Sequence, residues 1–292
     1  MGDRDTRQLA LMLGPYLFGL TFLIGLPAVV TFALSLTEYD LIRAPSFVGV
    51  ENFRELWDDE VFRISLRNSL MFMAFAVPLR LAGALALALL LHRRFRAVGA
   101  ARTSVYLPSV VPDVAYALLW LWIFNPLYGP LNLALNALGG PRPQWLTDPR
   151  AAQWAIIVMS LFVIGEGFLV VLATRQSLPA ELYELAALEG AKPWYVFARV
   201  TLPLIAPILL LLLFRDTIFS FQATFVPALI VTEGGPPPYA TTYLPVFAYQ
   251  NAFEYLRYGY AAAATLVMFA ITALIVYAQY RIVRRWRRDF VV

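Results

Sequence analysis

Residues 203–231 read PLIAPILLLLLFRDTIFSFQATFVPALIV, and the only charged residues in this stretch are Arg215 and Asp216. A helix needs about 20 mostly apolar residues, at roughly 1.5 Å each, to cross the hydrocarbon core of a bilayer. The stretch exceeds that length and therefore predicts a transmembrane helix. Charged side chains half-way along such a helix are costly in lipid, so they are expected to face protein or water.

Five further apolar runs of similar length occur along the chain. The 292 residues are 60% hydrophobic and only 14% charged, whereas ordinary soluble domains carry roughly a quarter charged residues. One soluble core cannot absorb that excess of apolar side chains. The composition therefore predicts an all-α polytopic membrane protein with six transmembrane helices in a single domain, residues 1–292. The predicted spans are residues 9–36, 68–91, 104–125, 151–174, 203–231 and 258–283.

The reactive side chains on which many enzymes depend are nearly absent. The chain has no cysteine, one histidine (His92) and one lysine (Lys192). This excludes disulfides, thiol nucleophiles and metal sites rich in cysteine or histidine. No phosphate-binding loop of the GxxxxGK[ST] type is present. We therefore expect no catalytic residues, no metal, no cofactor and no ATPase site in this chain.

Basic residues are distributed unevenly between the two sides of the predicted membrane. Fourteen lie on the side of both termini and seven on the opposite side, where the first loop also carries seven acidic residues from Glu38 to Glu60. The positive-inside rule then places both termini in the cytoplasm. Nucleic-acid binding is not expected, because no stacking aromatics are interleaved with the basic residues outside the membrane boundary. The fourteen are Arg4, Arg7, Arg93, Arg94, Arg96, Arg102, Arg175, Lys192, Arg199, Arg281, Arg284, Arg285, Arg287 and Arg288.

The fourth loop, residues 177–203, has strong helix signals for a short cytoplasmic connection. Pro179 suits the first position of a helix, and two glutamates follow where the helix dipole favours negative charge. Gly190 suits the end of that helix because it adopts a positive φ without steric cost. Pro193 opens a second short helix, which Pro203 is expected to separate from the next span. The loop therefore predicts an amphipathic helix–turn–helix suited to docking into a partner's groove.

The residue order in this loop resembles the EAA loop of ABC-importer permeases. Glu184-Leu185-Ala186 is followed by Gly190 and, after nine intervening residues, by Val200-Thr201-Leu202-Pro203; the pattern prefers Ala at position 185 and Asp at position 189, where this chain has Leu and Glu. In that family the loop is the coupling helix, seated in a cleft of the ATPase subunit. The resemblance implies ATPase contacts from Glu184, Ala186, Ala187, Glu189, Gly190 and Ala191.

Other segments resemble the carbohydrate-uptake branch of these permeases, in particular the first permease of the heterodimeric maltose, glycerol-phosphate and multiple-sugar type. Neither the large periplasmic insertion nor the extra N-terminal helices of the maltose version are expected here, so the chain is similar to the compact six-helix form. The matching segments are residues 47–53, 107–112, 120–132, 232–236 and 258–262.

This resemblance implies an assembly rather than an isolated transporter. The expected partners are a second homologous permease, two ATPase subunits that bind the ATP, and an extracytoplasmic solute-binding protein. The implied substrate is a sugar or sugar derivative, and the implied location is a bacterial inner membrane in contact with lipid.

Glu166 lies half-way along the fourth predicted span. As a substrate contact it would accept hydrogen bonds from sugar hydroxyls; as a structural residue it would pair with Arg80 or Arg215. Both interpretations stay open from the residues alone. Likewise, Phe219 would either stack on a pyranose face or pack against lipid or a helix. Resemblance to the maltose permease implies substrate contacts at Phe162, Glu166, Phe219, Ser220, Gln222 and Ala223.

Arg215 and Asp216 are adjacent, so on a helix their side chains point about 100° apart and do not simply pair with each other. Each either lines the transport pathway or forms a salt bridge to another helix. In the outer loop, Phe47, Leu56 and Trp57 contribute to helix-like apolar spacing. That spacing fits an amphipathic interfacial segment or a loop packed over helix ends.

Two other functional classes are less compatible with the sequence. An ion-coupled secondary transporter of small polar solutes is expected to show inverted repeats and broken helices, and no repeat is visible. An intramembrane enzyme would have to build its catalytic set from carboxylates, given the single histidine and single lysine.

Overall fold

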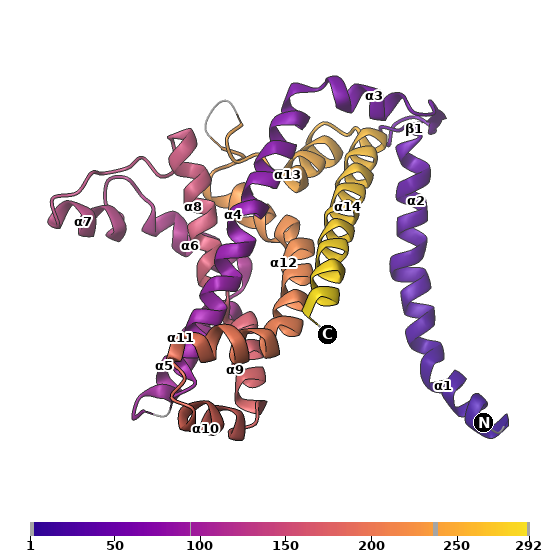
Figure 1. Cartoon of the computed structure of the whole chain (residues 1–292). Helices are drawn as coiled ribbons and strands as arrows, with labels where there is room; N and C mark the ends of the chain where they lie inside the picture. The colour runs from indigo at the N-terminus through magenta and orange to yellow at the C-terminus, as the bar shows by residue number, and fades with distance from the viewer. Residues whose placement is uncertain (1–2, 94, 236–238, 291–292) are drawn as a thin grey trace. The chain divides into compact units, whose positions relative to one another are not determined.

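The structure, a computed structural model, describes residues 3–93, 95–235 and 239–290, with side chains described from Leu11 to Arg284 inside those ranges (Figure 1). Within them the chain is helical apart from turns, loops and one short antiparallel ladder, in which β1 (Thr37–Glu38) pairs with β2 (Ser46–Phe47). The all-α fold class is confirmed. The chain forms two compact units: Met1–Phe62 with Phe247–Ile271, and Arg63–Val246 with Thr272–Val292.

In the first unit, polar contacts connect α3 to the end of α2 and to the residue that precedes α14. Asn52 donates to the carbonyls of Ser35 and Thr37, at 2.8 and 2.9 Å, and Arg257 pairs with Glu55 at 2.5 Å. The predicted apolar spacing forms a short helix, α3, whose Leu56 is fully buried while Trp57 is exposed. The helices are α1 (Asp3–Leu20), η1 (Thr21–Gly25), α2 (Leu26–Ser35), α3 (Glu51–Asp58), η4 (Gln250–Glu254) and the start of α14 (Tyr258–Phe290).

The second unit contains most of the remaining helices around two apolar clusters. One cluster joins Phe72, Trp120, Ile156 and Tyr243 among others. A second cluster packs α9 and α12 against α4 through residues that include Phe168, Ile205 and Ala88. The helices are α4 (Glu60–Leu91), α5 (Val98–Tyr106), η2 (Leu107–Val110), α6 (Asp113–Ile123), α7 (Pro130–Ala137), α8 (Pro149–Phe162), α9 (Gly165–Ser177), α10 (Glu181–Leu188), α11 (Pro193–Val196), η3 (Phe197–Thr201), α12 (Leu202–Val231) and α13 (Leu244–Tyr249), the last shared with the first unit.

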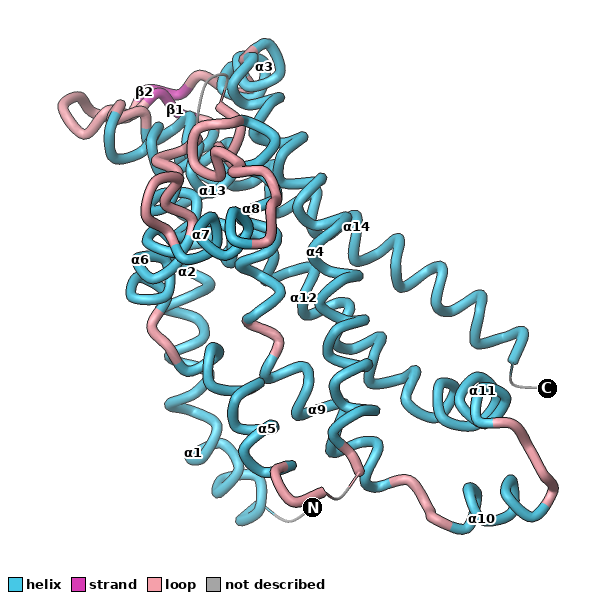
Figure 2. Tube along the Cα trace, turned by 90° about the vertical axis from the view of Figure 1, so that its left-hand side faces the viewer, coloured by secondary structure: helices cyan, strands magenta, loops and turns pink. Residues whose placement is uncertain are grey.

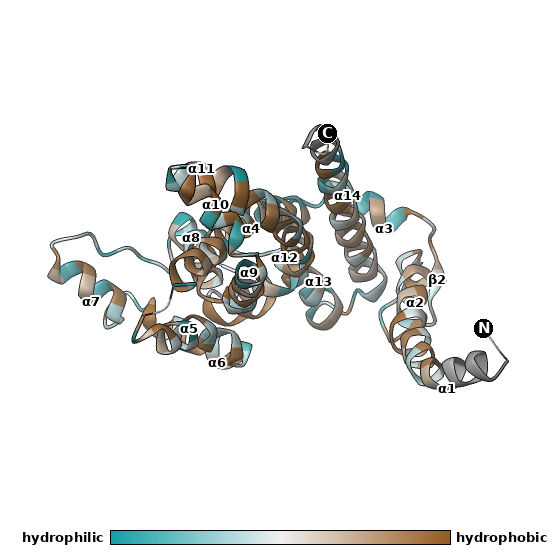
Figure 3. Cartoon of the chain, turned by 60° about the horizontal axis from the view of Figure 1, so that its bottom comes forward, coloured by the Kyte–Doolittle hydropathy of each residue, from teal (hydrophilic) through white to brown (hydrophobic). Residues whose placement is uncertain are grey.

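Four helices in the described ranges are long and apolar enough to cross a membrane without interruption: Leu11–Ser35, Glu60–Leu91, Pro193–Val231 and Tyr258–Arg284. Figure 3 shows how apolar residues predominate along α2, α12 and α14. The third and fourth predicted spans are not continuous helices. Val98–Val110 and Asp113–Ile123 meet at 104°, and Pro149–Phe162 and Gly165–Ser177 meet at 42°. The six predicted spans are therefore four continuous helices and two broken pairs.

The break in the third span follows from Pro112. Proline disfavours helical geometry in the residue before it, and Val111 is extended (φ −71°, ψ 131°). The break in the fourth span has no proline. Val163 leaves helical geometry there (φ −97°, ψ 52°), two residues before Gly165, and Figure 2 shows the short loop between α8 and α9. At this break the chain contacts another span, as described below.

Two other prolines are accommodated without a break. Proline cannot donate to the carbonyl four residues earlier, and its ring crowds that carbonyl. Before Pro27 and before Pro203 the helix widens into one π-helical turn, η1 and η3, in which the N–H of Leu26 or Leu202 reaches back five residues. The prediction that Pro203 separates a short helix from the next span is therefore wrong, because Pro193–Val231 is one helix.

The fourth loop forms the expected helix and turn. Helix α10 runs from Glu181 to Leu188 and lies at the end of the second unit opposite α7 (Figures 1 and 2). Pro179 does not occupy the first helical position as predicted, because Ala180 is the N-cap and the proline precedes it.

Candidate functional site

Two ion pairs connect α12 to its neighbours half-way along its length. Asp216 of α12 faces Arg80 of α4, with 3.6 Å between Oδ2 and Nε, and both side chains are only 12% exposed. Arg215 of α12 pairs with Glu166 in the first turn of α9, and this pair is much more open, at 37% and 56% exposed. Adjacent residues on α12 therefore bind different helices, one pair inside the unit and one at its surface.

This arrangement shows which residue Glu166 pairs with. Glu166 has Arg215 as its partner, so the expected ion pair exists, but the pair is exposed rather than buried. Arg215 and Asp216 do not pair with each other, as predicted, and each forms a salt bridge to another helix. The exposed face of the Glu166–Arg215 pair still has hydrogen-bonding capacity for a further ligand.

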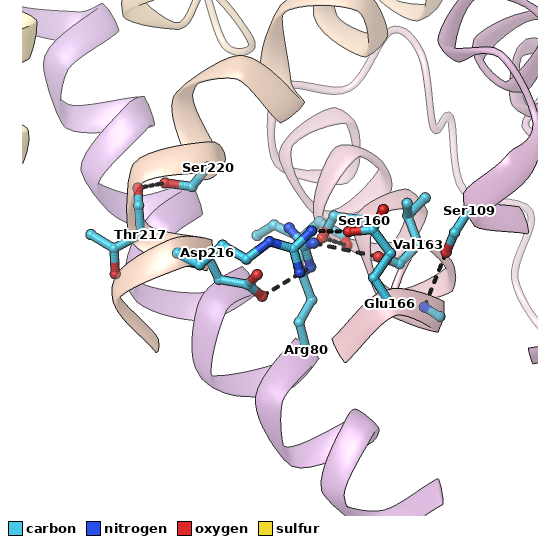
Figure 4. A network of polar contacts seen from close by, with 11 residues as sticks. Arg80, Ser109, Ser160, Val163, Glu166, Asp216, Thr217 and Ser220 are labelled. Carbon is cyan, nitrogen blue, oxygen red and sulfur yellow. Dashed lines mark hydrogen bonds and ion pairs between the residues drawn. The ribbon is translucent and has the colours of Figure 1, made fainter. Parts of the chain in front are cut away.

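Arg80 also contacts the break in the fourth span. Its guanidinium donates to the carbonyl of Val163 at 3.4 Å, so the cation that faces Asp216 also contacts a carbonyl at the interruption between α8 and α9 (Figure 4). Removing a buried carbonyl from its helix is costly unless it finds another donor. From the sequence, Arg80 is predicted only as a possible partner for Glu166, and nothing in the sequence indicates its contact with Val163.

The two broken spans meet at their breaks. The N–H of Gly165 donates to Ser109 Oγ at 3.1 Å, and Ser109 lies in η2 just before the break at Pro112 (Figure 4). A Cβ at position 165 would lie 2.6 Å from Ser109 Oγ and 2.8 Å from the Tyr106 Cα, so only glycine fits. The signal in the sequence was the pair of glycines flanking Glu166, because isolated glycines often mark close backbone approach.

The predicted substrate residues fall into two groups. Phe219 is 46% exposed and its ring lies 5.5 Å from the Arg215 guanidinium, so Arg215 joins it to Glu166. Phe162, Gln222 and Ala223 are exposed as well. Ser220 is different: it is buried and its hydroxyl donates to the Thr217 carbonyl of its own helix at 2.7 Å. The structure does not place Ser220 on the exposed face with the others.

The space between these helices is too small for a sugar. A cavity of about 10 Å³ is lined by residues that include Arg80, Gly167 and Asp216, which is room for one water molecule at most. A ligand at this level must therefore use the exposed side of the Glu166–Arg215 pair rather than the interior of the second unit.

Helix α10 ends in a complete glycine cap. Gly190 has φ +68°, its N–H donates to the Ala187 carbonyl at 3.0 Å, and the N–H of Ala191 donates to the Ala186 carbonyl at 2.9 Å. These two bonds define a Schellman motif. The left-handed conformation that the sequence predicted for Gly190 is confirmed.

The predicted ATPase-contact residues lie on or just after α10. Glu184, Ala187, Glu189 and Gly190 are exposed, and Ala186 and Ala191 are half-buried. Beside α10 lies an open groove of about 1130 Å³, whose lining includes His92, Arg102, Arg175, Tyr183 and Glu184. An exposed helix with a defined end beside a groove has the geometry of a docking element.

Comparison with known proteins identifies the family. Residues 81–288 match the family described as "Binding-protein-dependent transport system inner membrane component". The probable ABC transporter permease protein YesP of Bacillus subtilis is 33% identical over 94% of this chain and 89% of its own. The sulfoquinovosyl glycerol transport system permease protein SmoG of Agrobacterium fabrum is 32% identical over 97% of this chain and 92% of its own.

A solved structure shares the fold. The match is to the crystal structure of a bacterial alginate ABC transporter in complex with an alginate pentasaccharide-bound periplasmic protein, with a TM-score of 0.84, 24% identity, and coverage of 97% of this chain and 95% of that one. The resemblance inferred from the fourth loop is confirmed.

Pro236 of the 232–236 segment and Arg94 lie outside the described residues. This chain belongs to the binding-protein-dependent transport system inner membrane components, the membrane-spanning permease subunits of ABC importers.

Proposed function

We propose that this permease imports a sugar or sugar derivative, and that the exposed Glu166–Arg215 pair lies on the translocation pathway. The observation that carries the proposal is that this ion pair is exposed although it lies on helices of candidate membrane spans. Ionised side chains inside a membrane face a protein interior or a water-filled cavity rather than lipid. In the complete transporter this face would therefore be covered by a second permease, with the pathway between the two.

The chemistry of the exposed residues suits a carbohydrate. The Glu166 carboxylate accepts hydrogen bonds from hydroxyl groups and the Arg215 guanidinium donates them. The exposed Phe219 ring beside Arg215 offers an apolar face on which the C–H side of a pyranose ring can stack. The carbohydrate-derived substrate named for the Agrobacterium relative, a sulfoquinovosyl glycerol, supports the same substrate class.

We further propose that α10 docks into a cleft of an ATPase subunit. The exposed positions of Glu184, Ala187 and Gly190 on a capped helix outside the long apolar spans support this role. The chain itself contains no phosphate-binding loop, so ATP would be bound and hydrolysed by two ATPase subunits. An extracytoplasmic solute-binding protein would deliver the substrate on the opposite side.

The orientation follows from charge. Basic residues are twice as frequent on the side of α10 and the termini as on the opposite side, so both termini and α10 would lie in the cytoplasm of a bacterial cell whose inner membrane holds the protein. Broken helices were expected of an ion-coupled carrier, and two spans are broken here. Family membership nevertheless favours ATP-driven import over that alternative.

The substrate proposal is tested with the cognate binding protein. Its thermal unfolding is measured against a panel of neutral, phosphorylated and sulfonated glycosides, and the stabilising ones are assayed for uptake into proteoliposomes that contain the complete complex. Glu166→Gln should change the relative uptake rates within the panel, while Glu51→Gln, an exposed carboxylate in the outer loop, should not. Unchanged selectivity in a stable Glu166→Gln transporter would contradict the placement of Glu166 on the pathway.

A further inference from the structure

Tyr183 of α10 contacts both the C-terminal end of α9 and the N-terminal end of α12. Its ring lies 4.0 Å from the guanidinium carbon of Arg175, in the last turn of α9. Its hydroxyl lies 3.2 Å from Thr201 Oγ1, at the end of η3 where α12 begins. Thr201 is buried, whereas Tyr183 is half-buried, so the pair of hydroxyls is partly buried. One side chain of α10 therefore holds both helices, through a cation–π contact and a hydrogen bond.

The same two helices meet again at the exposed ion pair. Glu166 lies in the first turn of α9 and Arg215 lies half-way along α12. From Glu166 to Arg175, α9 rises about 14 Å, and from Thr201 to Arg215 the helix rises about 21 Å, at 1.5 Å per residue. The two helices also share one buried cluster, which includes Phe168, Leu172, Ile205 and Leu212. Contacts at Tyr183, in the buried cluster and at the ion pair thus join α9 and α12 at three levels.

We propose that Tyr183 is a positioning residue that makes α10, α9 and α12 move as one body. When an ATPase subunit displaces α10, the helices α9 and α12 that carry Glu166 and Arg215 would then be displaced by the same amount. This inference rests on the proposed docking of α10 on the ATPase. It assigns the transmission to a residue that precedes the Glu184–Gly190 segment and whose side chain contacts Arg175 and Thr201 of this chain.

Both parts of the tyrosine side chain are used. Phenylalanine would keep the ring over Arg175 but leave the buried Thr201 hydroxyl without its partner. Alanine would remove both contacts. Because a buried polar group without a partner is costly while two matched apolar groups are tolerated, combining Tyr183→Phe with Thr201→Val should repair the damage done by Tyr183→Phe alone.

The absence of cysteine makes a distance measurement direct. Cysteines are placed at Glu181, which is exposed on α10, and at Leu211, which is exposed on α12, and both are spin-labelled. This chain is assembled with a second permease and ATPase subunits whose own cysteines have been replaced. The distance between the labels is measured by pulsed electron resonance without nucleotide and after trapping with ATP and vanadate.

With Tyr183 intact, the distance should be the same in both states. With Tyr183→Ala, it should change on trapping by about 2 Å or more, the scale of helix shifts at interfaces. Tyr183→Phe should give a smaller change, and its combination with Thr201→Val should restore the intact behaviour. A change in the intact transporter, or constancy in the alanine variant, would overturn the inference.

Copurification separates this inference from the function on which it rests. The ATPase subunits should copurify with the Tyr183 variants and be lost with Glu184→Lys, whose side chain is exposed on α10. If the ATPase is retained by Glu184→Lys, the proposed docking is wrong. If it is lost with Glu184→Lys and kept by Tyr183→Ala, but the label distance never changes, docking stands and the role of Tyr183 fails.

Discussion

Arg215 and Asp216 are consecutive residues on α12, yet Arg215 pairs with Glu166 of α9 at the surface and Asp216 faces Arg80 of α4 in the interior. The turn of about 100° between neighbouring side chains on a helix produces this divergence. As a result, α12 is connected to two helices at one level. The buried pair contacts the break in the fourth span, whereas the exposed pair is available to a ligand.

The buried pair should matter for stability much more than the exposed one. Asp216→Asn or Arg80→Met alone leaves one buried charge without its partner and should lower the free energy of unfolding by about 3 kcal/mol. Glu166→Gln should change it by less than about 1 kcal/mol, because exposed pairs contribute little. Thermal unfolding of the purified protein measures both. The double variant of Arg80 and Asp216 should lose less free energy of unfolding than the two single variants lose in sum. Strictly additive losses would contradict an interaction between Arg80 and Asp216.

Gly165 should be irreplaceable while its neighbour Gly167 is not. Gly165→Ala places a Cβ 2.6 Å from Ser109 Oγ, so the two broken spans must separate, at a cost of about 1–3 kcal/mol. Gly167→Ala is the matched control, because its Cβ would lie 3.7 Å from the Ala84 Cβ, an ordinary contact. Unfolding temperatures of the two variants provide the comparison, and equal values would mean that the breaks do not meet as described.

The turn after α10 should tolerate only residues that accept a left-handed backbone. Gly190→Val should strain this conformation by about 1–2 kcal/mol and misdirect the chain that leads to Pro193, so ATPase copurification and uptake should collapse while membrane insertion persists. Gly190→Asn should retain much of both, because asparagine adopts this region more readily. A fully active Gly190→Val transporter would show that the turn does not orient the docking helix.

Topology reporters test the charge argument. Fusions after Arg96 and Arg288 should report the cytoplasm, and a fusion after Trp57 should report the outside, because basic residues concentrate on the side of the termini. Each fusion is made with two reporters, one that is active only in the cytoplasm and one that is active only outside, so every site gives a positive signal in one of the two assays. A cytoplasmic signal after Trp57 would overturn the orientation.

Local features were predictable from sequence because their causes lie within a few residues. The end of α10 at Gly190 depends on one glycine and four neighbouring backbone groups, and the divergence of Arg215 and Asp216 follows from helix geometry alone. The angle at Pro112 and the wide turn before Pro203 depend on how the chain accommodates a missing N–H. A proline in the sequence does not show whether the helix will break or widen.

Features formed between distant segments were not predictable in this way. The close approach of Gly165 to Tyr106 and Ser109 joins two different spans, and the burial of Ser220 depends on which face of α12 packs inward. Arg80 was recognised as a cation, but its contact with the Val163 carbonyl exists only because that break exposes it. No residue pattern within one span records such contacts.

The most direct test of the central claim concerns the energy source. The complete complex is reconstituted in proteoliposomes with the binding protein on the side opposite α10, and uptake is followed for the glycosides that stabilise the binding protein. We expect uptake only when ATP is present on the side of α10, and undiminished uptake after ionophores collapse the proton and sodium gradients. Uptake that proceeds without ATP and disappears with an ion gradient would contradict the account.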